Sequence, residues 1–166
     1  DFNNIQAAIN ASSDGDEIIV APGTYFTQST DGIRLSGKAV WLHSSDGLEV
    51  TFIVGGNGRG FICVDGETSS THIQGFTIQN CNASPYDWDG DGTIESWETS
   101  GGGMGNANSS PTVSDCKFRN NYADSGGGGM FNYKSKPLLF NCILSGNSVG
   151  ADASGGGIYN RYDSSP

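Results

Sequence analysis

The feature that most constrains this chain is a repeat in its second half. An alignment without gaps places GGGMGNANSSPTVSDCKFRNNYA (residues 101–123) over GGGMFNYKSKPLLFNCILSGNSV (residues 127–149), with a period of 26 residues. A third copy, GGGIYN, begins at Gly155. Repeats of this length indicate a solenoid, in which each repeat forms one rung that packs on its neighbours.

The composition of each repeat predicts strands rather than helices. Glycine triplets and a proline interrupt the repeats, and neither residue suits a long run of helix. The pieces between them alternate apolar and polar residues over three or four positions, as short strands joined by turns do. We therefore predict an all-β fold, a parallel β-helix in which equivalent residues of neighbouring rungs stack about 4.8 Å apart.

The period also predicts which side chains stack. The pairs expected to point inward are Val113 over Leu139, Cys116 over Cys142 and Phe118 over Leu144. An asparagine ladder at a turn, each amide bonded to the next, is expected from Asn106, Asn132 and Asn160. Cys116 and Cys142 could form a disulfide or stack as small apolar side chains, and stacking is favoured because free Cys is often buried.

The first half repeats less clearly but has the same short apolar runs separated by turn residues. Residues 1–166 are therefore predicted to form one domain. Apolar residues recur at helical spacing within residues 1–12, and an N-cap is expected at Asp1 or Asn3. These apolar residues are Phe2, Ile5, Ala8 and Ile9. A short amphipathic helix here would cover the open end of the solenoid.

Two segments resemble known β-helix proteins. The segment IQAAINASSDGDEIIVAPGTY (residues 5–25) is similar to the N-terminal cap and first rung of pectate-lyase-like right-handed β-helices. The GGGM-x-N units resemble the repeats of secreted and surface β-helix proteins of the polymorphic-membrane-protein type. Together these resemblances cover nearly the whole chain, and they imply a right-handed parallel β-helix in an extracellular or cell-surface protein.

One rung contains an insertion. Residues 73–83 (IQGFTIQNCNA) align with residues 113–123 at an offset that is greater than the period of the repeat. The 14 extra residues fall between Ala83 and Gly101. Residues 84–100 are therefore predicted to be an insertion into an otherwise regular rung and not a linker between domains.

The insertion contains a complete calcium-loop motif. Residues 87–98 read DWDGDGTIESWE and match D-x-[DN]-x-[DN]-G-x5-E, in which carboxylates on a tightly curved loop converge on one Ca²⁺. The predicted ligands are Asp87, Asp89, Asp91, the Thr93 carbonyl, Glu95 directly or through water, and Glu98 with both carboxylate oxygens. Gly92 permits the sharp turn, and Ile94 is expected to anchor the loop against the solenoid.

The residues around the motif differ from those of a calcium sensor. Pro85 precedes the loop and a glycine triplet follows it, which leaves room for about one turn of helix around residues 96–100. A single loop without two long flanking helices cannot open as sensors do. The calcium ion is therefore expected to stiffen the insertion.

The charge balance excludes some partners. The chain has 18 Asp and Glu residues against 8 Lys and Arg, a net charge of −10. This charge repels nucleic acid and disfavours direct capture of acidic polysaccharides. No apolar run approaches the length of a membrane span.

No catalytic constellation stands out. His43 and His72 are isolated in the sequence, and Asp115 and Asp124 resemble turn residues. We predict a non-catalytic, calcium-stabilised extracellular module with a structural, fibre-forming or adhesive role. Its expected partners are cell-surface carbohydrate or other copies of itself, joined head to tail, because the third copy stops at Pro166 and leaves an incomplete rung.

The alternative is a carbohydrate-active enzyme, a polysaccharide lyase or glycoside hydrolase, since many pectate-lyase-like proteins have that activity. This alternative predicts a groove lined with carboxylates and aromatic residues along one outer β-face. The structural alternative predicts small Gly, Asn and Ser residues on that face.

Overall fold

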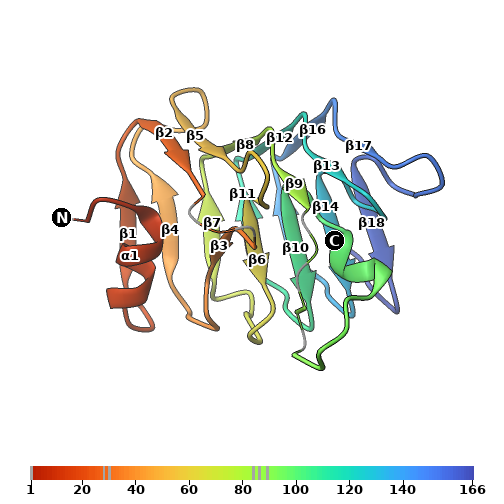
Figure 1. Ribbon diagram of the computed structural model, residues 1–166. Coiled ribbons are helices and arrows are strands. Elements are labelled where there is room, and N and C mark those ends of the chain that lie inside the picture. Colours follow the sequence, from red (N-terminus) through yellow and green to blue (C-terminus); the bar gives the residue numbers. More distant parts are fainter. Residues whose placement is uncertain (1, 28, 30, 84, 86, 89) are drawn as a thin grey trace.

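The chain winds into a parallel β-solenoid, seen from the side in the computed structural model of Figure 1. The structure describes residues 2–27, 29, 31–83, 85, 87–88 and 90–166. Three five-stranded sheets and one three-stranded sheet run along the axis, and neighbouring strands pair in parallel throughout. This architecture confirms the predicted parallel β-helix.

Each rung contributes one strand to each main sheet in the order A, B, C. Sheet A contains β1 (Glu17–Val20), β4 (Trp41–Ser44), β7 (His72–Gln74), β11 (Thr112–Ser114) and β15 (Leu138–Phe140). Sheet B contains β2 (Gly23–Phe26), β5 (Thr51–Val54), β8 (Thr77–Gln79), β12 (Lys117–Arg119) and β16 (Ile143–Ser145). Sheet C contains β3 (Ile33–Arg34), β6 (Phe61–Cys63), β10 (Met104–Ala107), β14 (Met130–Tyr133) and β18 (Ile158–Arg161). Between B and C, the short strands β9 (Asn82–Ala83), β13 (Tyr122–Ala123) and β17 (Ser148–Val149) form sheet D.

The strand register follows the repeat read from the sequence. Met104 pairs with Met130, one period further along the chain, and Ala83 pairs with Ala123 across the insertion, as the alignment predicts. Met130 pairs with Ile158, so the last rung is slightly longer than the repeat. The extra length falls in the loop between β17 and β18, which projects from the solenoid in Figure 1.

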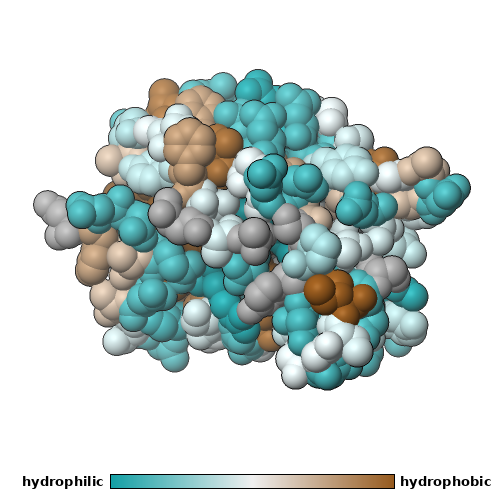
Figure 2. Space-filling model, in the orientation of Figure 1, coloured by the Kyte–Doolittle hydropathy of each residue, from teal (hydrophilic) through white to brown (hydrophobic). Residues whose placement is uncertain are grey.

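The core consists of three apolar stacks, one from each main sheet. They are Ile18, Leu42, Ile73, Val113 and Leu139 in sheet A, Tyr25, Ile53, Ile78, Phe118 and Leu144 in sheet B, and Ile33, Phe61, Met104, Met130 and Ile158 in sheet C. Burial of each large apolar side chain contributes about 1.5–3 kcal/mol. Hydrophilic residues cover much of the face shown in Figure 2, as a core enclosed within the coil requires.

The two stacked cysteines lie in this core as free thiols. Cys116 and Cys142 occupy equivalent positions on successive rungs, and neither forms a disulfide. Burial raises the pKa of the Cys116 thiol to about 12. At neutral pH this thiol is protonated and acts as a small apolar side chain.

The predicted asparagine ladder exists, but it lies on strands instead of at a turn. The Nδ2 of Asn106 donates to the Oδ1 of Asn132 (2.8 Å), and the Nδ2 of Asn132 donates to the Oδ1 of Asn160 (2.8 Å). These residues are in β10, β14 and β18, on the same face of the strands as the methionines. A second ladder does lie at a turn, after β12 and β16, where the Nδ2 of Asn121 donates to the Oδ1 of Asn147 (3.1 Å).

A short helix covers the N-terminal end of the solenoid, as predicted. Helix α1 spans Ile5–Ala11 and buries Ile5 and Ile9 against the first rungs. Its N-cap is Asn4, whose side chain accepts a hydrogen bond from the N–H of Ala7 (2.8 Å). The cap predicted at Asn3 is wrong because Asn4 is the residue placed to reach that N–H, and Asp1 lies outside the described residues.

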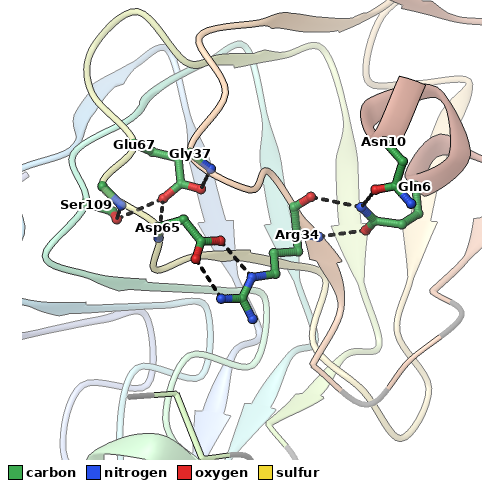
Figure 3. A network of polar contacts seen from close by, with 8 residues as sticks. Gln6, Asn10, Arg34, Gly37, Asp65, Glu67 and Ser109 are labelled. Atoms are coloured by element: carbon green, nitrogen blue, oxygen red, sulfur yellow. Dashed lines mark hydrogen bonds and ion pairs between the residues drawn. The ribbon is translucent and has the colours of Figure 1, made fainter. Parts of the chain in front are cut away.

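A polar network ties this helix to the following rungs (Figure 3). Gln6 exchanges hydrogen bonds with the backbone of Arg34, whose guanidinium forms two 2.7 Å bonds to Asp65. The buried Glu67 carboxylate accepts bonds from the N–H of Gly37 (2.9 Å) and the hydroxyl of Ser109 (2.8 Å). These bonds join the turns that follow β3, β6 and β10. Within the part of the chain that is described, no helix is long and apolar enough to span a membrane.

Removal of an asparagine side chain from the ladder should destabilise the fold more where the lost hydrogen bond is buried than where it is exposed. Asn132→Ala should lower the free energy of unfolding by about 2–3 kcal/mol, because the fully buried amide of Asn106 loses its acceptor. Asn160→Ala should cost about 1 kcal/mol or less, since Asn160 is exposed and water can replace it. Urea denaturation followed by circular dichroism measures both values. Equal losses would contradict a ladder whose contribution depends on burial.

Candidate functional site

The insertion that follows β9 lies on the outer face of sheet C (Figure 1). The Trp88 ring covers Gly105 of β10 so closely that a Cβ on this glycine would lie 2.4 Å from the indole. Trp88 also packs edge-on against Phe131 of β14, with 6.2 Å between ring centroids. Gly105, which has no side chain, thus leaves the space into which the insertion packs. All four residues of β10 are buried.

A buried arginine holds the far end of the insertion. Arg59, in the loop between β5 and β6, is fully buried, with its guanidinium carbon 4.8 Å from the centre of the Trp88 ring. Its Nε donates to the carbonyl of Ser100 (3.1 Å), and its Nη2 donates to the carbonyl of Glu98. Burial lowers the pKa of Arg59 to about 9, although Asp31 and Glu98 oppose the shift, so the side chain is still charged at pH 7. One arginine therefore links the solenoid to both parts of the insertion.

The first half of the predicted calcium loop is folded around its own carboxylates. The Asp87 carboxylate accepts hydrogen bonds from the N–H groups of Gly90 (2.6 Å) and Gly92 (2.9 Å). The Oδ1 of Asp91 accepts bonds from the hydroxyl (2.7 Å) and the N–H (2.8 Å) of Thr93, which lower the pKa of Asp91. These bonds curve the backbone tightly. Asp89 lies outside the described residues.

The second half of the loop ends in a 3₁₀ helix, η1 (Ser96–Thr99), near the predicted position. Glu98 is fully buried, and its carboxylate accepts hydrogen bonds from the N–H of Glu95 (2.9 Å) and of Trp88. Burial raises the pKa of Glu98, and the adjacent Glu95 carboxylate adds to the rise. The Oε2 of Glu95 is buried and has no hydrogen-bond partner among the described residues.

These residues fit calcium in chemistry, although the described ones do not gather into a metal site. Every predicted donor is an oxygen, as a hard cation requires, and the unpaired Glu95 oxygen lies in this loop. Across the residues with described positions, however, no group of three or more His, Cys, Asp or Glu side chains is gathered closely enough to hold a metal. Calcium binding by Asp87, Asp91, Thr93, Glu95 and Glu98 therefore remains a prediction.

The predicted role of Ile94 as the apolar anchor is wrong. Its side chain is 54% exposed. The two indoles of the insertion anchor it instead, with Trp97 stacked on Tyr133 (4.6 Å between centroids) and edge-on to Trp88 (5.4 Å). Indole rings offer more area for burial than an isoleucine does, and they match the aromatic outer face of β14.

An open groove of about 510 Å³ runs beside the insertion on the same side of the solenoid. Its lining includes Ser100, which forms a parallel bridge with Gly126. The aromatic and charged residues that line it are Trp97, Asp124, Asp152, Tyr159 and Arg161. The repeat alone does not reveal this groove, because residues from the insertion and from the lengthened last rung form it.

A second cluster lies on the outer face of sheet A. Trp41 stacks on His43 (4.3 Å between centroids) and lies beside His72 (6.2 Å). His43 pairs with Glu17 (2.8 Å), and His72 hydrogen-bonds to Ser114 (2.8 Å). Burial lowers the pKa of His72, and Asp115 opposes this shift. The two histidines are therefore not isolated, contrary to what the sequence suggested. They meet because β4 pairs with β7, with Trp41 opposite His72, and the repeat of the second half does not predict this register.

Comparisons with protein-family models, curated proteins and solved structures found no match. The resemblance to pectate-lyase-like and polymorphic-membrane-protein-type repeats therefore remains a prediction.

The seat of Trp88 can be tested with a pair of glycine substitutions. Gly105→Ala should lower the free energy of unfolding by about 1–3 kcal/mol, because the new methyl group displaces the Trp88 ring. Gly157→Ala, in the last sheet C rung, should change it by less than about 0.5 kcal/mol, since the nearest atom is 4.0 Å away. Thermal unfolding and near-ultraviolet circular dichroism report on both variants. Identical behaviour would show that the insertion does not sit on Gly105.

Proposed function

We propose that this chain is a non-catalytic, calcium-stabilised β-helix module of an extracellular or cell-surface protein, with a structural or adhesive role. The observation that carries the proposal is the packing of the insertion that contains the calcium-loop motif on the outer face of sheet C, through Trp88 and Arg59. A loop held at both ends is suited to stiffening a surface, while a sensor requires a pair of helices that can open.

The physical reason for a cation in this loop is its charge. Five acidic residues occur within twelve positions, from Asp87 to Glu98, and Glu95 and Glu98 lie close enough to raise the pKa of Glu98. A bound Ca²⁺ would neutralise this repulsion and cross-link the two halves of the loop. Asp87, Asp89, Asp91, Glu95 and Glu98 would supply carboxylate oxygens, and Thr93 would supply its carbonyl. Extracellular calcium is the natural source for such a site, which supports an extracellular location.

The partners proposed for the module are cell-surface carbohydrate and other copies of the chain. On the neighbouring strands β15 and β16, Leu138, Phe140 and Ile143 are exposed. Exposed apolar side chains on neighbouring strands favour association between chains. Light scattering of the purified protein distinguishes a monomer from a head-to-tail assembly.

Calcium should stabilise the protein through the loop. At a concentration of 100 times Kd, a ligand adds about 2.7 kcal/mol, and for a chain of this size that corresponds to a rise of about 5–10 °C in Tm. Asp91→Asn should reduce calcium affinity at least tenfold, because it removes one ligand charge from an exposed position. The control Asp46→Asn removes an exposed carboxylate outside the loop and should retain the full shift. Calorimetric titration and thermal unfolding that show no calcium effect on the unaltered protein would refute the proposal.

A carbohydrate-active enzyme is the second candidate, and the sheet A cluster favours it. Trp41, 42% exposed, could stack on a sugar ring, and the His43–Glu17 pair beside it could transfer a proton. Both histidines of the chain are within this cluster. The enzymatic alternative predicts a groove with carboxylates and aromatic residues on one outer β-face, and of these features the cluster provides Trp41 and Glu17.

A turnover assay separates the two candidates. The non-catalytic module should release no reducing sugar or unsaturated product from neutral or uronic-acid polysaccharides, with or without calcium. Turnover that Glu17→Gln abolishes and Lys136→Ala leaves unchanged would instead establish the enzyme. Lys136 is an exposed residue away from the cluster, so its loss controls for non-specific effects.

A further inference from the structure

The groove on the sheet C side is bordered by the two places where the second half of the chain departs from its repeat. One is the insertion, which contributes Trp97. The other is the lengthened loop between β17 and β18, which contributes Asp152. Both departures therefore border the same groove, although Trp97 and Asp152 lie far apart in the sequence.

The chemistry of the groove suits a carbohydrate without acidic groups. Trp97 and Tyr159 offer aromatic surface for the apolar faces of sugar rings. Asp124, Asp152 and Arg161 offer charged groups that hydrogen-bond strongly to hydroxyls. Two carboxylates against one guanidinium, in a chain of net charge −10, disfavour a uronic acid. The shallow, open form suits a chain that lies along the surface better than a small molecule enclosed on all sides.

The position of Trp97 depends on the calcium loop. Trp97 is the second residue of η1, and the predicted ligands Glu95 and Glu98 lie on either side of it. The carbonyls of Glu98 and Ser100, which accept hydrogen bonds from Arg59, follow it closely along the chain. A rearrangement of Glu95 or Glu98 that shifts η1 would therefore shift the indole relative to Tyr133.

We infer that this groove binds a neutral oligosaccharide, and that calcium in the neighbouring loop is required to hold Trp97 in its binding position. Arg59 acts as the positioning residue, since it joins the loop to the solenoid. The inference rests on the proposed calcium site and adds to it a ligand class and a means of control. Adhesion through this groove would then require bound calcium in the loop.

The experiment measures oligosaccharide binding and calcium binding separately on the intact chain. Arrays of neutral and uronic-acid oligosaccharides identify a ligand, and calorimetry then gives its affinity in calcium and in a chelator. We expect neutral oligosaccharides to bind, with at least tenfold weaker binding in chelator. Asp152→Asn, in an exposed loop, should weaken oligosaccharide binding about tenfold and leave calcium affinity unchanged, whereas the exposed control Asp163→Asn should change neither.

The coupling is tested through Arg59 and Trp97. Arg59→Lys retains a charge but cannot form the same pair of bonds, so it should make oligosaccharide binding weak even in saturating calcium. Trp97→Ala should abolish binding and Trp97→Phe should restore part of it, while both variants still bind calcium. Near-ultraviolet circular dichroism verifies that each variant is folded.

Three results would overturn the inference. If calcium binds but no neutral oligosaccharide does, the groove is not the site, and the calcium-stabilised module still stands. If oligosaccharides bind equally in calcium and in chelator, the coupling is wrong. If the chain does not bind calcium at all, the proposed function fails and the control mechanism fails with it.

Discussion

The parallel pairing of equivalent residues on successive rungs is the constraint on which the rest of this structure depends. Each strand must place its inward side chain about 4.8 Å from the one before, so the core can only be a set of continuous stacks. Apolar side chains stack at this spacing because their sizes match it. In the asparagine ladder, Asn106, Asn132 and Asn160 stack through hydrogen bonds from one side-chain amide to the next. A departure from the repeat can therefore occur only in the turns, where extra residues leave the coil.

The two departures in the second half of the chain show how a regular solenoid acquires a specific surface. The insertion after Ala83 folds back on sheet C because Gly105 leaves room for Trp88 and because Arg59 hydrogen-bonds to its far end. Two carbonyl acceptors and an indole face offset part of the cost of burying the guanidinium, while its buried Nη1 has no hydrogen-bond partner among the described residues. The outer face of sheet C thus becomes a second, smaller core formed around Ile62, Trp88, Ala107 and Phe131.

Much of the fold could be predicted from the sequence because one repeat length determines which residues pair in many neighbouring strands. The register of Met104 with Met130 and the offset at Ala83 follow directly from aligned residues. The seat of the insertion could not be predicted in this way. Arg59, Gly105 and Trp88 come from three different rung positions without any shared motif, and Ile94 was favoured as the anchor only by its place in the loop. Likewise, Trp41 and His72 meet only because β4 and β7 pair at an irregular offset.

Within the candidate site, the motif predicted which residues supply oxygen atoms, but it could not predict how they are arranged. In the described structure, backbone N–H groups occupy the carboxylates of Asp87, Asp91 and Glu98, whereas one oxygen of Glu95 is left without a partner. The motif does not encode this competition between backbone and cation, because it depends on where the insertion is held on the solenoid.

A crystal structure of the protein grown in calcium tests the central claim most directly. The account predicts one cation peak inside the loop from Asp87 to Glu98, with oxygen ligands at about 2.3–2.6 Å, the distances typical of calcium. It also predicts Trp88 on Gly105 and Arg59 bonded to the carbonyls of Glu98 and Ser100. A loop without a cation at saturating calcium, or an insertion detached from sheet C, would contradict it.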